Sequence, residues 1–103
     1  MDKAEAKRLL MLEMEKLIRV PYAIFADWIE RRHVEILEPI GSSGTEYCVE
    51  VEAFWDGVPH ADICVLGSID DGGLWAAMKP LCASFLLSPD GTLQTGWEFP
   101  ART

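Results

Sequence analysis

The spacing of apolar residues changes once along this chain, near residue 32, and this change constrains the fold more than any other feature. Before it, apolar side chains such as Ala6, Leu10 and Met14 recur every three to four positions, as they do on one face of a helix. After it, apolar and polar residues alternate, for example in "TEYCVEVEAFW" at 45–55, as they do in a half-buried strand. Helical spacing followed by strand spacing predicts an α+β fold.

The first 32 residues predict one or two helices. Asp2, with Glu5 three residues later, matches a capping box at the start of an amphipathic repeat over 3–19. Pro21 interrupts that repeat. It is either the first residue of a second helix, with Trp28 on the inner side, or a kink in one long helix. The sequence leaves both alternatives open.

The rest of the chain predicts a sheet of four or five antiparallel strands. Strand-like runs lie at 33–40, 47–55 and 61–69 and in a hairpin at 81–99. Short loops between them favour a meander with the helices packed on one face. Asp-Gly pairs, which supply the positive φ angles of tight turns, occur at 56–57, 71–72 and 90–91. We expect a single domain over 1–103, with helices in 1–32, the sheet in 33–99 and a loose tail at 100–103.

Acidic residues are concentrated in the predicted sheet. The formal net charge is −8, and residues 33–101 hold eleven acids with Lys79 as their only base, whereas residues 1–32 hold six acids and seven bases. Such a surface lacks the lysines and arginines that bind a phosphate backbone, so we expect no nucleic-acid partner. It favours a basic protein surface as the partner, because opposite potentials steer association.

The N-terminal residues and the cysteines argue against further classes of protein. Glu13 interrupts the apolar run "LLMLEM", which predicts neither a secretory signal nor a transmembrane span, and we expect a cytoplasmic protein without a membrane partner. Three cysteines without a C-x-x-C spacing argue against a disulfide framework and a zinc site. No nucleophile elbow or phosphate loop occurs. The sequence indicates no catalytic residue, metal or cofactor, and leaves open whether the chain is an enzyme.

The two central strands predict a sheet with two different faces. A register with Val51 opposite Ile63 places the apolar residues of both strands on one face, and it requires a loop of three or five residues. On the other face, Glu52 then lies directly opposite Asp62, with further polar groups nearby. We expect this acidic group to bind the partner, and it consists of Glu50, Glu52, His60 and Asp62.

Beside the acidic group, the same register predicts an exposed apolar strip of Cys48, Phe54, Cys64 and Leu66. Exposed apolar patches usually mark an interface. In one hypothesis, a second copy of the chain covers the strip across a two-fold axis, with the acids at the rim. In the other, the second helix of the same chain covers it.

Two functions fit these features. The first is a noncatalytic binding protein, inhibitor- or adaptor-like, that presents its acidic face to a basic protein partner. The alternative is a small-molecule-binding domain or small enzyme with a Trp-lined pocket between helix and sheet. The pocket residues in that case are Trp55, Asp70, Asp71, Trp75 and Trp97. Asp70 and Asp71 also suit a tight turn, which is the interpretation that the recurring Asp-Gly pairs favour.

Overall fold

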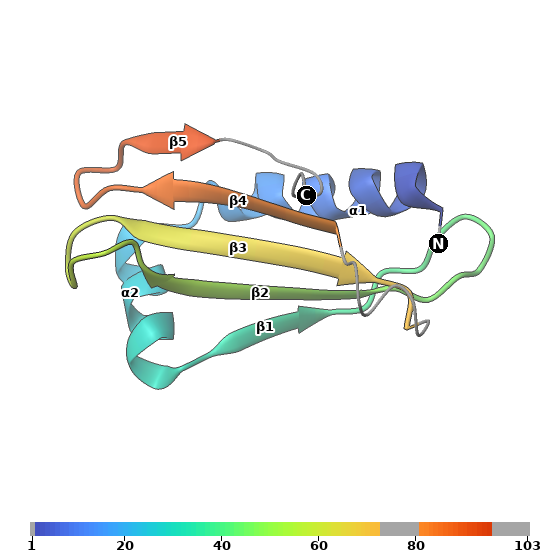
Figure 1. Ribbon diagram of the computed structural model, residues 1–103, viewed down its shortest axis with the longest axis horizontal. Coiled ribbons are helices and arrows are strands. Elements are labelled where there is room, and N and C mark those ends of the chain that lie inside the picture. Colours follow the sequence, from blue (N-terminus) through green and yellow to red (C-terminus); the bar gives the residue numbers. More distant parts are fainter. Residues whose placement is uncertain (1, 73–80, 96–103) are drawn as a thin grey trace.

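The chain folds into two layers, and a computed structural model describes residues 2–72 and 81–95 of it (Figure 1). One layer is a five-stranded antiparallel meander in the order β1-β2-β3-β4-β5. The other layer consists of two helices, which lie on the same side of the sheet. The predicted α+β fold is confirmed. The elements are α1 (Lys3–Leu17), α2 (Tyr22–Arg31), β1 (Val34–Leu37), β2 (Cys48–Trp55), β3 (Ile63–Asp70), β4 (Leu81–Leu87) and β5 (Leu93–Thr95).

Pro21 separates the two helices, as one of the two alternatives predicts. It is the N-cap of α2, with an extended backbone at φ −64° and ψ 150°, and it has no N–H with which to continue α1. At the start of α1, the Oδ1 atom of Asp2 accepts a hydrogen bond from the backbone N–H of Glu5 at 3.0 Å. The other half of the predicted capping box is wrong, because the Glu5 carboxylate binds the loop between β1 and β2 instead.

The hydrophobic core lies between the helices and the strand residues that face them. Along β3 and β4, every second side chain is buried and its neighbours are half-buried, as the alternating sequence predicts. The two helices and the sheet contribute to one continuous core. Its largest fully buried side chains are Phe25, Phe85, Leu10, Met14, Ile63, Ile69, Val49, Val51 and Val65.

Gly67 allows α1 to lie close to the centre of the sheet. It is a buried residue of β3, and a Cβ atom at this position would lie 2.6 Å from Sδ of Met14 and 3.3 Å from Cδ1 of Leu10. Such a contact is shorter than van der Waals packing permits. The glycine therefore sets the distance between helix and strand.

The predicted register of β2 against β3 is wrong. Val51 lies opposite Gly67, four positions along β3 from the predicted partner Ile63, and Trp55 lies opposite Ile63. Because the displacement is an even number of residues, each side chain keeps the face that the sequence predicts. The acidic pairs predicted across the strands are lost, since Glu52 now lies opposite Leu66.

Tertiary contacts hold the longer loop, 56–62, that this register requires. The backbone N–H of Asp56 donates to the carbonyl oxygen of Asp62 at 2.9 Å and closes the loop. The hydroxyl of Tyr22, at the start of α2, donates to the carbonyl oxygen of Ala61 at 2.6 Å. A helix that is distant in the sequence thus helps to fix the loop, so the three- or five-residue loop predicted from local sequence does not form.

Candidate functional site

The side chains of the sheet that point away from both helices form its second face, which we call the open face. Both helices of the described chain, residues 2–72 and 81–95, pack on the opposite side. The strand registers assign the following residues to the open face: Val34, Ile36, Cys48, Glu50, Glu52, Phe54, Cys64, Leu66, Ser68, Asp70, Cys82, Ser84, Leu86 and Gln94.

The predicted apolar strip lies on the open face. Phe54 is 42% exposed and lies opposite Cys64, whereas Cys48, Cys64 and Leu66 are half-buried. The hypothesis that the second helix covers the strip is wrong, because α2 belongs to the core on the other side. Its apolar side chains, Phe25 above all, have their neighbours there. The strip thus remains on a surface that neither helix covers.

The predicted acidic group divides between two places. Glu50 and Glu52 are exposed on the open face, but Asp62 and His60 belong to loop 56–62. Asp62 accepts a hydrogen bond from Oγ of Ser88 at 2.9 Å. The His60 ring lies 5.0 Å, between centroids, from the ring of Trp55, a residue of the helix-facing side. The changed register is the cause, because it moves both residues out of β3.

The charge on the described part of the open face lies on β2 and at the end of β3. Glu50 and Glu52 are on β2, and Asp70 is the last residue of β3. The open-face residues of β4 and β5 that the structure describes carry no charge: Cys82, Ser84, Leu86 and Gln94. A row of carboxylates therefore borders an uncharged, partly apolar surface.

All three cysteines lie half-buried on the open face. Burial raises the pKa of Cys48, Cys64 and Cys82, and nearby acids such as Asp70 raise the pKa of Cys48 further. A thiol with a raised pKa remains protonated at neutral pH, and the thiolate is the nucleophilic form. These cysteines therefore act as small apolar groups of the surface.

Of the residues predicted to line a Trp-lined pocket, the structure describes three, and it places Trp55 at the opposite end of the sheet from Asp70 and Asp71. Trp55 pairs with Ile63 at one end of the β2–β3 ladder, and Asp70 pairs with Cys48 at the other. Oδ1 of Asp70 accepts a hydrogen bond from the backbone N–H of Gly72 at 2.8 Å, so Asp70 stabilises a turn. Asp71 follows Asp70 directly, at the same end of the sheet. The remaining two pocket residues, Trp75 and Trp97, lie outside the described residues.

The turn interpretation of the recurring Asp-Gly pairs fits the backbone. Gly57, Gly72 and Gly91 have φ angles of 92°, 80° and 93°, in the region that favours glycine. Asp90 also accepts a hydrogen bond from the backbone N–H of Thr92 at 2.8 Å, and the side chain of Thr92, followed by this N–H, lowers the pKa of the Asp90 carboxyl group. The side chain of Asp90 thus stabilises its own turn.

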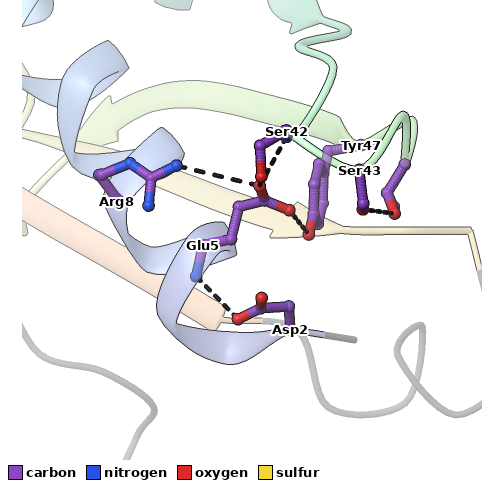
Figure 2. Close-up of polar contacts among 7 residues, drawn as sticks. Asp2, Glu5, Arg8, Ser42, Ser43 and Tyr47 are labelled. Carbon is purple, nitrogen blue, oxygen red and sulfur yellow. Dashed lines mark hydrogen bonds and ion pairs between the residues drawn. The ribbon is translucent and has the colours of Figure 1, made fainter.

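Glu5 forms a polar cluster that sequence reasoning missed (Figure 2). Its Oε1 atom accepts a hydrogen bond from the hydroxyl of Tyr47 at 2.8 Å, and its Oε2 atom accepts two from Ser42, from N–H at 2.7 Å and from Oγ at 2.8 Å. Arg8 lies 3.9 Å from the same carboxylate. The loop passes so closely that a Cβ atom at Gly41 would overlap Glu5. Glu5 therefore ties the start of α1 to the loop before β2.

The donors around Glu5 hold its pKa below the ordinary value of 4.5, with the Ser42 N–H as the largest cause and the Tyr47 hydroxyl next. Burial, first, and then the hydrogen bond to the Glu5 carboxylate and its negative charge together raise the pKa of Tyr47 to about 12. Because the carboxylate is favoured in the folded state, its contribution to stability is complete above the pKa of the unfolded chain. It is lost as the pH falls through the folded-state pKa.

We expect the stability difference between the wild type and Glu5→Gln to depend on pH for this reason. The wild type should be more stable at about pH 7, and its advantage should shrink as the pH falls from about 5 to about 3. Urea unfolding of both proteins across this range, followed by tryptophan fluorescence, measures the difference. An advantage that stays constant over the range would show that the ionised carboxylate is not what stabilises the loop.

The described residues, 2–72 and 81–95, present neither a metal-binding cluster nor a membrane-spanning helix. Among them, no group of three or more His, Cys, Asp or Glu side chains is arranged to hold a metal ion. No helix of this part of the chain has the length and hydropathy needed to cross a membrane. Comparisons with protein-family models, with curated proteins and with solved structures found no match to the chain.

Proposed function

We propose that this chain is a noncatalytic binding protein whose open face docks on a basic surface of a protein partner, as an inhibitor or adaptor does. One observation carries the proposal. Each charged side chain that the structure describes on the open face is acidic, namely Glu50, Glu52 and Asp70, and these acids border half-buried apolar side chains such as Leu66. An apolar centre with charged groups beside it is the usual composition of a protein interface.

The separation of charge between the two layers supports a basic partner. Residues 33–72 and 81–95, which contain the strands, hold no lysine or arginine, whereas the helical residues 3–32 hold seven. The acids of the open face thus have no lysine or arginine neighbour among the described strand residues. A surface of one sign attracts an oppositely charged partner and accelerates its association.

The position of Glu52 favours a basic partner over a second copy of the chain. Glu52 has an apolar residue opposite it on each neighbouring strand, Val34 on β1 and Leu66 on β3. A second copy placed face to face would bring two such carboxylates into one interface without a counter-charge, which is unfavourable. A lysine or arginine of a basic partner supplies the counter-charge.

Reversing the charge of Glu50 and Glu52 should abolish partner binding. We expect immobilised Glu50→Lys/Glu52→Lys protein to lose basic proteins that the wild type retains from a lysate of the source cell at low salt. Mass spectrometry of the retained fractions identifies these proteins and their isoelectric points. The matched control is Glu15→Lys/Glu30→Lys, which makes the same change in net charge at exposed positions of α1 and α2.

The control separates a specific face from bulk acidity. If both double variants lose the same proteins, overall charge alone retains them, and the proposal is wrong. All four substitutions replace exposed residues, so we expect each double variant to differ from the wild type by less than about 1 kcal/mol in the free energy of unfolding. Urea unfolding verifies that both variants are folded before the comparison.

A further inference from the structure

The open face is wide enough and long enough to bind one α-helix that lies along β3. Two strand spacings separate β2 from β4, which is about 10 Å, and an α-helix with its side chains has a diameter of about 10 Å. β3 is eight residues long and spans about 27 Å, the length of about 18 helical residues. A helix on this line covers Cys64 and Leu66 of β3 and Leu86 of β4.

The carboxylates stand on one side of this line, at a spacing that a helix matches. Glu50 and Glu52 are two residues apart on β2, so their side chains are about 7 Å apart. Residues i and i+4 of a helix are about 6 Å apart along its axis. On the other side, the described residues of β4 and β5 present uncharged groups only. This surface thus has apolar side chains along its centre, acidic side chains on one side and uncharged side chains on the other.

We infer that the basic partner binds through an amphipathic α-helix laid along β3. Its apolar stripe contacts Leu66 and Leu86, and a pair of lysines or arginines at i and i+4 faces Glu52 and Glu50. This inference rests on the proposed function and specifies the partner's element. The helix would give the sheet a second covering layer, which is the common arrangement for a sheet with apolar side chains on both faces.

Strand addition at the edge of the sheet fits the structure less well. β1 is four residues long, Val34–Leu37, and Pro39 follows it closely. Short edge strands and nearby prolines oppose pairing with another chain. The exposed apolar side chains of β1, Val34 and Ile36, belong to the open face, as do those of β3 and β4, so a partner that uses them must lie on the face.

Three synthetic peptides of about 18 residues test the inference by fluorescence anisotropy at low and moderate salt. The first has leucines at helical spacing with lysines along one flank, the second is a scramble of the same composition, and the third is oligolysine. We expect the amphipathic peptide to bind at least tenfold more tightly than the scramble, a difference of about 1.4 kcal/mol. We expect Glu50→Lys/Glu52→Lys and, separately, Leu66→Ser to weaken its binding, and Glu15→Lys/Glu30→Lys to leave it unchanged.

The outcomes separate this inference from the proposed function. If all three peptides bind equally and only Glu50→Lys/Glu52→Lys weakens them, the acidic face binds basic chains but no helix is selected, and the inference fails alone. If the lysate proteins depend on the face but no peptide binds, the inference again fails and the function stands. If peptide binding is unaffected by either face substitution, the peptide binds elsewhere. Light scattering of the free protein measures its oligomeric state. If the protein is a dimer and Leu66→Ser dissociates it, a second copy of the chain covers the open face and the inference is wrong.

Discussion

Replacing Val51 with aspartate is expected to unfold the protein. Val51 is fully buried in the core, opposite Gly67 and beneath the helices. An aspartate there places a carboxylate among apolar side chains with no base near it, and burial of an unpaired charge costs several kcal/mol. Because a small domain has only about 5–15 kcal/mol of stability in total, we expect a loss of about 4 kcal/mol or more. Circular dichroism and urea unfolding measure it.

Phe54→Asp is the matched control, since it introduces the same side chain into the same strand on the other face. Phe54 is 42% exposed, so its replacement leaves the new carboxylate in water. We expect this variant to stay folded, with a loss on the order of 1 kcal/mol from the apolar contacts removed. If the two variants are equally destabilised, the difference in burial between the two faces does not exist in solution.

Gly67→Val is expected to have the second-largest effect. A strand usually gains up to about 1 kcal/mol when a β-branched residue replaces glycine. Here the new side chain meets Met14, whose Sδ atom would lie 2.6 Å from the added Cβ, and Met14 is itself fully buried. Overpacking of a close-packed core costs about 1–3 kcal/mol. We therefore expect a net loss of roughly 2 kcal/mol, measured by urea unfolding.

Two comparisons test whether the close packing of α1 on β3 causes the loss of stability in Gly67→Val. Ser68→Val makes a similar change one residue away on the open face, so we expect it to be neutral or slightly stabilising. In a Met14→Ala background the obstruction is removed, and Gly67→Val should cost less than in the wild type. A double-mutant cycle measures this coupling. The absence of any coupling would contradict the close contact between Gly67 and Met14.

Much of the fold was predictable because it depends on local patterns. The apolar spacing of α1, the missing N–H of Pro21 and the alternation in β2 each act over a few residues. The recurring Asp-Gly pairs likewise mark the turns at Gly57, Gly72 and Gly91. The faces of the residues in β2 and β3 followed as well, because alternation has a period of two. Hence Cys48, Phe54, Cys64 and Leu66 were assigned to the correct side.

The register of β2 against β3 was not predictable, because alternation has a period of two. A displacement of two or four residues preserves the faces, so the sequence pattern allows several registers equally. Contacts between distant segments select one of them. Tyr22 binds the carbonyl oxygen of Ala61 in loop 56–62, and Gly67 sits beneath Met14. The predicted pair of Glu52 and Asp62 does not form, because it required the other register.

The sequence by itself determined the order of helices and strands, the two faces of the sheet and the concentration of acids on its strands. Tertiary structure alone decided which acids share a surface, which side the helices cover, and that Glu5 joins α1 to Ser42 and Tyr47, across 37 and 42 residues. The physical reason is the range of the interactions. Periodicity and turn chemistry act between neighbours in the chain, whereas register and buried hydrogen bonds depend on segments that meet only when the whole domain has packed.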